Sequence, residues 1–600
     1  MLDHKYILTS FLAILAMVGA LSSSNLQVET RFGIAEGKLT KTVRGRLVAN
    51  FLGIPYAYPP IGELRFRNPV PYNETWESPY YALSDSLMCA QLDQNGKVIG
   101  SEDCLYLNIF VPLVSESFLR SIMFYIHGGA FNIGSSDSHK ISPYYLLDQE
   151  LILVTLNYRL NALGFFSTAN QASPGNYGIK DILTALKWVN ENIGDFGGDP
   201  DTLTLSGHSA GATAAHFLAL SKSAQGLFHR CIFQGGSAML PLGVHSHRYI
   251  RRASLEMWDA WEELDDPTNV ELDEETMECM RNVPAEELLL RAGNPHCVFG
   301  PTIEEPSEDA VVTMHPLTAI KNHEFPDVPM IFGVAEDEGL VKTTKFYVDF
   351  QAEEEMINNF DLYLPYALEY HEVVPNFTAF SRAVEEFYFD GNISTHASRL
   401  FQIVGDALIT WPVYRAAKLH SQHVNASIYF YRFSYQGTFT GTFSTGIAKH
   451  FGVAHGDEMN YLFPKLNYKF RDQLLHNTED DTTMINVMTE MWAAFATYGV
   501  PTAWMTPTWP NFAETGQLMR FGLGKSPDLR VEDEFLPERM AFWENVTSNL
   551  IEEPLDDEFR SDPAEGQEIL PNFATTRRSN KLLLSTFLII IVGVYRIDLN

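Results

Sequence analysis

The sequence predicts an α/β protein in which a central, mostly parallel sheet carries helices on both faces. Short apolar runs of the kind that form buried strands recur along the chain, and helix-like stretches lie between some of them. Such alternation is typical of parallel sheets that helices cover on both sides. From about residue 28 to residue 547 there is no low-complexity linker and no internal repeat. We therefore expect one large domain over residues 25–548.

The expected strands and helices follow from these patterns in chain order. The strands are Ile122–Ile126, Leu151–Leu156, Leu203–Ser206, Cys231–Phe233, Pro329–Val334 and Ser427–Phe433, with helices at Ile179–Ile193 and Ala210–Ser221. Catalytic groups in such sheets gather at the carboxyl ends of the strands. The segment Phe346–Leu419 is mainly helical in pattern, and we expect it to pack over those ends as a lid or a pocket wall.

The composition describes a folded protein that does not bind nucleic acid. The chain has 42 Lys and Arg against 75 Asp and Glu, which gives a formal net charge of −33. Nucleic-acid binding depends on basic side chains that neutralise phosphates, so DNA and RNA are excluded as partners. The 46% hydrophobic residues, including 40 Phe and 26 Tyr, exclude a disordered acidic chain.

Residues 1–22 have the pattern of a secretory signal peptide. A short polar start leads into an apolar run from Tyr6 to Leu21, and small residues and serines follow it. Five Asn-x-Ser/Thr sequons are expected to carry glycans: Asn73, Asn376, Asn392, Asn425 and Asn545. Together these features predict a secreted, extracellular glycoprotein in which disulfides can form.

The C-terminal end combines an acidic segment with an apolar tail. Residues 549–581 are expected to form a solvated acidic stalk. The tail, residues 582–600, contains the apolar run Leu582–Tyr595. As a helix that run spans about 21 Å, which is less than the roughly 30 Å of a bilayer core. A membrane span, a removable signal for a lipid anchor and no attachment at all therefore stay open as interpretations.

The chain has only five cysteines, so we expect one or two disulfides rather than a disulfide framework. Cys89 and Cys104 are the best candidates for a pair, because they close a short polar loop. Cys231 lies in an apolar run and is predicted to be a buried free thiol.

A predicted strand–turn–helix element carries the candidate nucleophile. Gly207-His208-Ser209-Ala210-Gly211 has the GxSxG pattern, with an alternating strand before it and a helix of small residues after it. Glycines in this setting let the strand and the helix approach closely, and the serine is pushed out on a strained turn. The alternative is a plain Gly/Ser turn without a catalytic role.

A serine hydroxyl needs a base, and the base needs an orienting acid. Enzymes with this elbow place them in the chain order Ser, acid, His. Downstream, Glu336-Asp337-Glu338 follows an expected strand, and His455 lies in a glycine-flanked turn. Spacing alone does not choose among the three acids, and an acidic solvated loop is the alternative interpretation of that run.

The reaction also needs donors for the oxyanion of the tetrahedral intermediate. The glycine-rich turn His127-Gly128-Gly129-Ala130-Phe131 follows the expected strand Ile122–Ile126. We expect backbone N–H groups of this turn, together with the N–H of Ala210, to form the oxyanion hole.

With these motifs the chain resembles the type-B carboxylesterases, a family that includes the cholinesterases and many secreted insect esterases. The resemblance extends from about Gly33 to Phe542. It rests on Phe51–Ala57 with Pro59-Pro60, Glu102–Asn108, Asn157–Arg159, Gly175–Gly178 with Asp181, Phe196–Pro200, and Trp492 with Phe495, Gly499 and Pro501. It implies the α/β-hydrolase fold and ester hydrolysis through an acyl-enzyme intermediate, and neither a metal nor an organic cofactor is expected.

The resemblance also assigns roles to individual residues. Ser209 is the implied nucleophile, Glu338 the acid and His455 the base. The remaining implied roles are oxyanion donors at Gly129, Ala130 and Ala210, a first disulfide between Cys89 and Cys104, and a structural ion pair between Arg65 and Glu102.

Three positions depart from the family pattern. The second disulfide of the family closes on a position that resembles Cys279, but its earlier partner is missing, so Cys279 is either free or paired unusually, for example with Cys297. Gly235 stands where the family has a serine, which removes a hydroxyl near the acid. Ala335 stands where asparagine is usual. None of these changes removes a triad member.

The expected substrate is a small hydrophobic carboxylic ester. Choline esters are poor candidates, because the loop between Cys89 and Cys104 contains no aromatic residue for a cation–π contact. Juvenile hormone esterases usually have Gln where His208 stands, which weakens that assignment. The alternative functions are a protein that sequesters ligands or organophosphates with low turnover, and a cholinesterase-like adhesion protein. The sequence leaves the oligomeric state open.

Overall fold

The computed structural model describes residues 26–113, 119–241, 243–257, 272–293, 298–343, 357–391, 399–446 and 449–552. The expected signal peptide, most of the acidic stalk, the apolar tail, Asn392 and Cys297 lie outside these residues. Within the described ranges, each helix is too short or too polar to cross a membrane.

One large sheet organises the molecule. In spatial order its strands are β1 (Leu26–Thr30), β2 (Gly33–Lys41), β3 (Leu47–Pro55), β7 (Tyr106–Pro112), β9 (Ile152–Leu156), β8 (Arg120–Ile126), β10 (Gly198–His208), β11 (Arg230–Gln234), β12 (Met330–Ala335), β13 (Ile428–Tyr435), β14 (Leu518–Gly524) and β15 (Ser526–Glu532). The short strand β4 (Tyr80–Tyr81) pairs with β2, and β5 (Gln91–Leu92) pairs with β6 (Val98–Ile99) in a separate hairpin.

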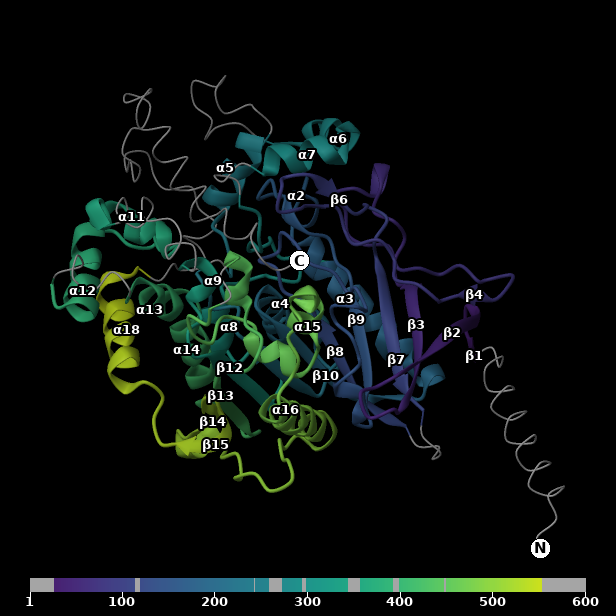
Figure 1. The fold of residues 1–600 in the computed structure, drawn as a ribbon. Helices are drawn as coiled ribbons and strands as arrows, with labels where there is room; N and C mark the ends of the chain where they lie inside the picture. Colours follow the sequence, from purple (N-terminus) through teal and green to yellow (C-terminus); the bar gives the residue numbers. More distant parts are fainter. Residues whose placement is uncertain are drawn as a thin grey trace, which may run out of the picture.

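The middle of the large sheet is parallel, whereas its two ends are antiparallel. All neighbours from β9 to β14 in the spatial order run parallel. Antiparallel pairs join β1 to β9 at one end and β14 to β15 at the other. Figure 1 shows the antiparallel strands β1, β2 and β3 at one side of the parallel strands. The predicted, mostly parallel sheet is therefore confirmed, and each strand expected from the sequence is present within it.

Among the described residues, α-helices lie between the strands and after the last of them. They are α2 (Asn161–Phe165), α3 (Tyr177–Asn192), α4 (Ala210–Leu220), α5 (His247–Met257), α6 (Glu274–Asn282), α7 (Ala285–Ala292), α8 (Pro316–Lys321), α9 (Leu340–Thr343), α11 (Phe360–Ala367), α12 (Phe377–Phe389), α13 (Leu400–Gly405), α14 (Trp411–Ser421), α15 (Lys465–Lys469), α16 (Glu479–Tyr498), α17 (Phe512–Thr515) and α18 (Pro537–Leu550). A π-helical turn at Asp406–Thr410 joins α13 to α14.

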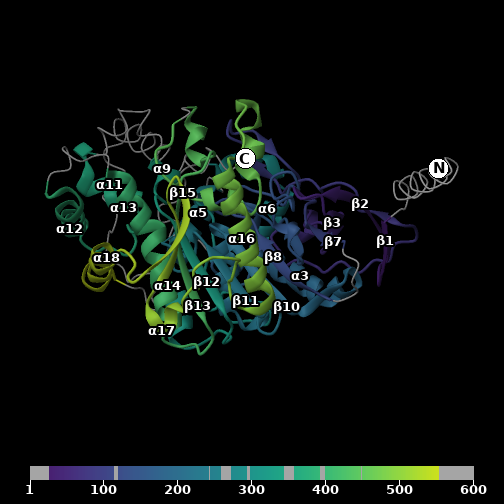
Figure 2. The ribbon, with the colours of Figure 1, turned by 60° about the horizontal axis from the view of Figure 1, so that its bottom comes forward.

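Two hydrophobic cores lie on opposite faces of the sheet, because successive side chains of a strand point to opposite sides. Phe124 of β8 belongs to the core that contains residues of α3, α4 and α14. Its neighbours Met123 and Tyr125 belong to the core that contains residues of α16. Figure 2 shows α16 in front of the strands, on one side of the sheet. The expectation of helices on both faces is confirmed.

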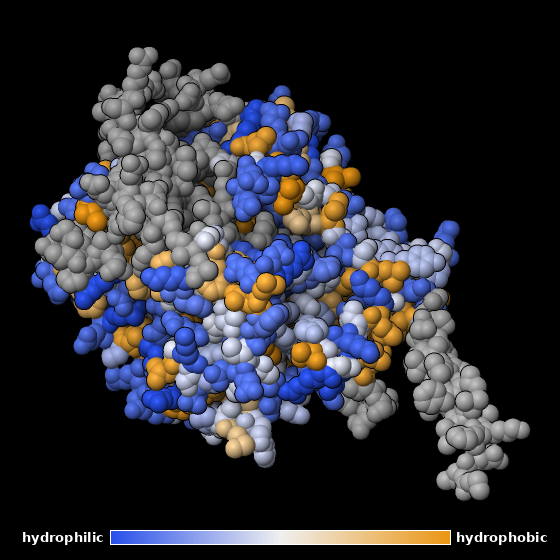
Figure 3. Space-filling model, in the orientation of Figure 1, coloured by the Kyte–Doolittle hydropathy of each residue, from blue (hydrophilic) through white to orange (hydrophobic). Residues whose placement is uncertain are grey.

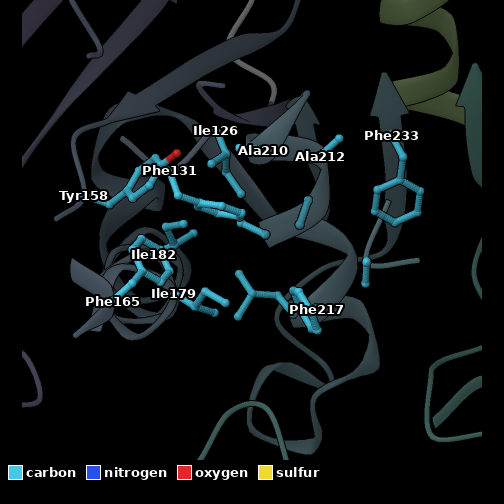
Figure 4. Packing of buried hydrophobic residues seen from close by; sticks show 14 of the residues in the cluster. Ile126, Phe131, Tyr158, Phe165, Ile179, Ile182, Ala210, Ala212, Phe217 and Phe233 are labelled. Carbon is cyan, nitrogen blue, oxygen red and sulfur yellow. The ribbon is translucent and has the colours of Figure 1, made fainter. Parts of the chain in front are cut away.

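The first of these cores lies directly below the predicted elbow. Figure 4 shows Ala210 of α4 near Ile126 and Phe131, with Ile179 of α3 on the opposite side of the same cluster. Ala210, Ile126 and Phe131 are at most 5% exposed. The small alanine side chains at the start of α4 therefore allow this helix to lie close to the sheet.

The segment expected to be helical near residues 346–419 contains α11, α12, α13 and α14, although residues 344–356 and 392–398 lie outside the described part. In Figure 1 α11, α12 and α18 lie together at one edge of the molecule. The segment reaches the carboxyl end of β12 through α13, because an added Cβ at Gly339 would lie 1.8 Å from the carbonyl oxygen of Phe401. The helical prediction is confirmed for these described elements.

Hydrophilic residues cover most of the described surface in Figure 3, and hydrophobic residues are scattered in small groups. The four described sequon residues Asn73, Asn376, Asn425 and Asn545 all have exposed side chains. Their exposure meets the geometric requirement for glycosylation, which itself stays a prediction.

Candidate active site

Ser209 lies on a sharp turn between β10 and α4. Its backbone has φ 57° and ψ −127°, a strained conformation for a residue with a side chain. The turn requires Gly207, because an added Cβ at that position would lie 2.3 Å from the carbonyl oxygen of Gly211. Ser209 is partly exposed, whereas His208 and Ala210 on either side of it are buried. This is the geometry expected for the elbow.

The glycine-rich turn after β8 lies against the serine. A Cβ added to Gly128 would come within 2.9 Å of the Ser209 Cβ atom. Gly129, Ala130 and Phe131 all have positive φ angles, of 125°, 52° and 61°. Among the described residues no hydrogen bond engages the N–H groups of Gly129, Ala130 or Ala210. These three donors are therefore free to bind an anionic oxygen beside the serine.

The acid and the histidine come from two loops that pair with each other. Asp337, after β12, forms a bridge with Ala454, in which its N–H donates to Val453 and its carboxylate accepts the Val453 N–H, both at 2.9 Å. This bridge sets the loop that carries Glu338 beside the loop that carries His455. Two segments more than a hundred residues apart in the chain are held in register in this way.

Glu338 and His455 form the closest polar contact of the site. The distance from His455 Nδ1 to Glu338 Oε2 is 2.5 Å, and the side chains are 3% and 0% exposed. Glu338 Oε1 also accepts the N–H of Ala335 at 2.7 Å. Because Nδ1 donates to a carboxylate, the lone pair of a neutral His455 lies on Nε2.

The turn after β11 lies between Ser209 and the pair formed by Glu338 and His455. A Cβ at Gly235 would lie 2.9 Å from His455 Cε1 and 3.4 Å from Glu338 Oε1, and a Cβ at Gly236 would lie 2.3 Å from the Ser209 carbonyl oxygen. The Ser209 N–H also donates to the Gln234 carbonyl oxygen at 2.8 Å. With φ 56° and an added Cβ only 2.9 Å from the His455 ring, position 235 suits glycine, and a larger residue would require that ring to shift.

Further wholly or partly buried carboxyl groups lie around Glu338 and His455: Asp337, one of the three acids among which spacing does not choose, and Asp457 and Glu458, for which the sequence predicts no role. Burial raises the pKa of Asp457 to about 7 and that of Asp337 to about 6. Burial and the nearby Glu338 raise the pKa of Glu458 as well, and neither oxygen of Glu458 has a hydrogen-bond partner among the described residues. The sequence signal for Asp457 and Glu458 is that they form a pair of acids directly after Gly456 in a stretch that is otherwise mostly apolar.

His208 is a second histidine at the site. Its ring centroid is 4.6 Å from that of His455, and its side chain is 3% exposed. Burial and the neighbouring His455 lower its pKa well below the ordinary value of histidine, so it is neutral near pH 7. The sequence alone shows only that this position differs from the Gln that is usual in juvenile hormone esterases.

The predicted disulfide and ion pair are both present. Cys89 and Cys104 are joined, with a Cα–Cα distance of 5.0 Å. Arg65 donates to both oxygens of Glu102 at 2.7 Å each. Cys231 is free and buried as predicted, whereas Cys279 is exposed and has no disulfide partner among the described residues, which do not include Cys297.

One group of described residues could approach a metal ion together: Asp85, Asp137 and His139. Protein donors bind both carboxylate oxygens of Asp85 and one oxygen of Asp137. Asp85 accepts hydrogen bonds from Asn108 and from Ser138, and Asp137 accepts the His139 N–H. The group therefore works as a hydrogen-bonded loop anchor.

Comparison with known proteins connects this geometry to one family. A family model described as the carboxylesterase family matches residues 24–543. Esterase FE4 of Myzus persicae is 32% identical over 547 residues, which cover 86% of this chain and 92% of that protein. Juvenile hormone esterase of Tribolium castaneum is 29% identical over 521 residues, which cover 82% of this chain and 87% of that protein.

Solved structures agree with the sequence relatives. The crystal structure of juvenile hormone esterase from Manduca sexta with OTFP covalently attached has a TM-score of 0.75 at 26% identity. It covers 88% of this chain and 100% of its own. A structure named PNB esterase has a TM-score of 0.67 at 25% identity, and it covers 86% of this chain and 100% of its own.

Proposed function

This chain belongs to the carboxylesterase family, with the α/β-hydrolase fold, and is a carboxylic ester hydrolase; from that premise we propose that it cleaves esters through Ser209, His455 and Glu338. The observation that carries the proposal is the 2.5 Å contact from His455 Nδ1 to Glu338 Oε2, behind a partly exposed serine on a strained turn. A buried carboxylate in this position fixes the tautomer of the histidine and stabilises its protonated form.

In the first half of the reaction, His455 Nε2 takes the proton of the Ser209 hydroxyl as its oxygen attacks the ester carbonyl carbon. The carbonyl oxygen becomes an oxyanion, which the N–H groups of Gly129, Ala130 and Ala210 bind. The intermediate then collapses, His455 gives its proton to the departing alkoxide, and the alcohol leaves. The acyl group stays on Ser209 as an ester.

In the second half, water takes the place of the alcohol. His455 removes a proton from the water as its oxygen attacks the acyl carbon, and the same three N–H groups bind the second oxyanion. Collapse breaks the bond to Ser209 Oγ, which recovers the proton from His455. The carboxylic acid leaves, and the three side chains return to their starting state.

We propose a small hydrophobic ester as the substrate, without a choline group. The hairpin β5–β6 within the loop closed by Cys89 and Cys104 presents no aromatic ring that could hold a quaternary ammonium. A panel of p-nitrophenyl esters of increasing acyl length, with a thiocholine ester beside it, tests this assignment directly.

The triad proposal is tested by a pair of serine variants. We expect Ser209→Ala to lower kcat by at least about 10⁴-fold, because the nucleophile is lost. The matched control is Ser206→Ala on the same strand, whose hydroxyl donates to the Phe124 carbonyl oxygen and should leave kcat within about 3-fold. A fluorophosphonate should label the peptide that contains Ser209. Activity retained in Ser209→Ala would refute the mechanism, and stoichiometric labelling without turnover would favour the sequestering protein.

We also propose that the protein follows the secretory route and carries N-glycans. The apolar leader and the exposed sequon residues Asn73, Asn376, Asn425 and Asn545 support this. Expression in secreting cells, followed by glycosidase treatment and mass measurement, tests the proposal. A secreted protein of unchanged mass would contradict the glycosylation.

A further inference from the structure

Two fully buried histidines lie behind the candidate active site and take no part in the triad. His216 is on α4, seven residues after Ser209, and His420 is at the end of α14. Their Nε2 atoms are 2.8 Å apart, and both residues are 0% exposed. The rings of Phe233 and Phe332 surround the pair, with centroids 4.8 Å and 5.9 Å from that of His216.

The hydrogen bonds of the pair fix the position of its protons. The Ala238 N–H donates to His216 Nδ1 at 3.1 Å, so this nitrogen carries a lone pair. Burial lowers the pKa of His216 to about 3, and a neutral His216 must then carry its proton on Nε2. His216 therefore donates to His420 Nε2. The proton of His420 lies on Nδ1, which has no partner among the described residues.

Only the His216 tautomer with its proton on Nε2 can accept the hydrogen bond from the Ala238 N–H, and His420 favours that tautomer. If His216 carried its proton on Nδ1, the ring N–H would face the Ala238 N–H and the contact would be repulsive. The acceptor at His420 Nε2 attracts the proton to the opposite side of the His216 ring. Burying a polar group without a partner is unfavourable, so the orphaned Nδ1 proton of His420 is a cost of this arrangement.

Ala238 is the last residue of turn 235–238, which contacts both Ser209 and His455. Gly235 in this turn lies against the His455 ring, and Gly236 lies against the Ser209 carbonyl. A second link to α4 is the hydroxyl of Thr213, which donates to the Ser237 carbonyl oxygen at 3.1 Å. The helix that carries the serine thus holds the turn that backs the histidine.

We propose that His216, kept in one tautomer by His420, is a positioning residue that holds turn 235–238 against Ser209 and His455. This inference rests on the proposed function, since it concerns the geometry between those two side chains. A displacement of about 1 Å in such a pair can lower a rate by about 100-fold. The backbone of Gly235 limits where the His455 ring can lie. The hydrogen bond from the Ala238 N–H to His216 fixes the position of this backbone.

The test compares two amide substitutions of His216. An Asn oxygen can take the place of Nδ1, so His216→Asn keeps the acceptor for Ala238 and loses the bond to His420. A Gln amide reaches the position of Nε2, so His216→Gln keeps the bond to His420 and loses Ala238. We expect His216→Gln to lower kcat by about 10- to 100-fold with KM changed less than about 3-fold. We expect His216→Asn to keep kcat within about 3-fold.

A purely structural role would lower the melting temperature of both variants and would leave kcat per folded molecule the same in both. That result, or a greater loss of kcat in His216→Asn than in His216→Gln, would overturn the proposal. Active-site titration with a fluorophosphonate gives the concentration of folded enzyme in each preparation. If Ser209→Ala kept its activity in the same assay, the triad would be wrong, which separates that failure from this one.

A second pair keeps the test decisive if His216→Gln does not fold. Thr213→Val is nearly isosteric and removes the hydroxyl that donates to Ser237, whereas Thr213→Ser keeps it. The proposal predicts a kcat about 3- to 10-fold lower for the valine variant than for the serine variant, again at similar KM. Equal kcat values in these two variants, with equal melting temperatures, would overturn the role of the turn.

Discussion

The two halves of the candidate active site are built in different ways. The nucleophile half consists of Ser209 and the turn 127–131, and its backbone conformations come from glycines and alanines within a few residues. The acid–base half consists of Glu338 and His455, which are 117 residues apart and are held together by the Asp337–Ala454 bridge. The first half also lacks carboxyl groups, whereas the second contains Asp337, Asp457 and Glu458 beside Glu338.

This difference indicates how each half is specified. A tight turn between a strand and a helix is a local property, so short stretches of sequence determine it. A buried carboxylate–imidazole pair depends on the packing of distant segments, and burial of the extra carboxyl groups is unfavourable there. We therefore expect substitutions in the acid–base half to act through charge, and substitutions in the nucleophile half to act through backbone geometry.

The largest expected effect is that of Glu338→Gln. The amide can no longer stabilise a protonated His455, and we expect kcat to fall by roughly 10³- to 10⁴-fold with KM little changed. The matched control is Glu336→Gln, because the Glu336 carboxylate is bound to Arg432 and Ser434 of the neighbouring strand β13 and, among the described residues, forms no hydrogen bond or ion pair with His455. Steady-state kinetics on one p-nitrophenyl ester measure both. Equal losses in the two variants would show that the loop, rather than one carboxylate, matters.

A smaller effect is expected from Gly129→Ala in the nucleophile half. Gly129 has φ 125°, and an added Cβ would lie 1.9 Å from the Ile133 carbonyl oxygen. The turn must shift, and the loss of one oxyanion donor lowers kcat by about 10²- to 10³-fold. Gly226→Ala is the control, because Gly226 has φ 83° but no neighbour within 4 Å of an added Cβ. If both variants kept kcat, the turn would not be the oxyanion hole.

The smallest effect is a pH dependence of stability that arises in the acid–base half. Asp337 and Asp457 have folded-state pKa values of about 6 and about 7, above that of an unfolded aspartate near 3.9. Their stabilising contribution is full below the unfolded pKa and is lost as the pH rises through 6 and 7. Between pH 5 and 7.5 we expect a loss on the order of 1 to 3 kcal/mol for each group.

Thermal unfolding of the wild-type protein at pH 5 and pH 7.5 measures this loss. Asp457→Asn cannot ionise, so the difference between the two pH values should shrink in that variant. A wild-type protein that is more stable at pH 7.5 than at pH 5 would show that the hydrogen bonds to Asp457 from Thr440, Gly441 and Ala454 outweigh its burial.

The sequence predicts the nucleophile half almost completely and the acid–base half only in part. The strand, the elbow and the glycine turn follow from patterns of neighbouring residues. Spacing did not distinguish Glu338 from Glu336 and Asp337, and only the family resemblance selected it, because that choice depends on which carboxylate the fold turns inward. Glycine at position 235 is compatible with the structure, since its φ is 56° and an added Cβ would lie 2.9 Å from the His455 ring, but the sequence alone does not predict that contact.

The sequence patterns do not predict the contacts of the buried residues around the site, His216, Asp457 and Glu458. His216 lies in a helix of small and apolar residues, where a histidine gives no signal of its partner on α14. Asp457 and Glu458 resemble a solvated acidic turn until the packing of the loop beside β12 is known. The parallel sheet was predictable because each strand is a continuous apolar run, whereas these contacts join segments that share no pattern.

The free thiol of Cys231 gives this protein an internal reporter of unfolding. It lies within β11, between β10 and β12, and burial raises its pKa, so an alkylating reagent cannot reach a thiolate there while the sheet is closed. Cys279 is exposed and should react with the same reagent at once. The slow phase of alkylation at Cys231 would then measure the rate at which β11 opens, without any added label. This strand directly precedes turn 235–238, which contacts His455.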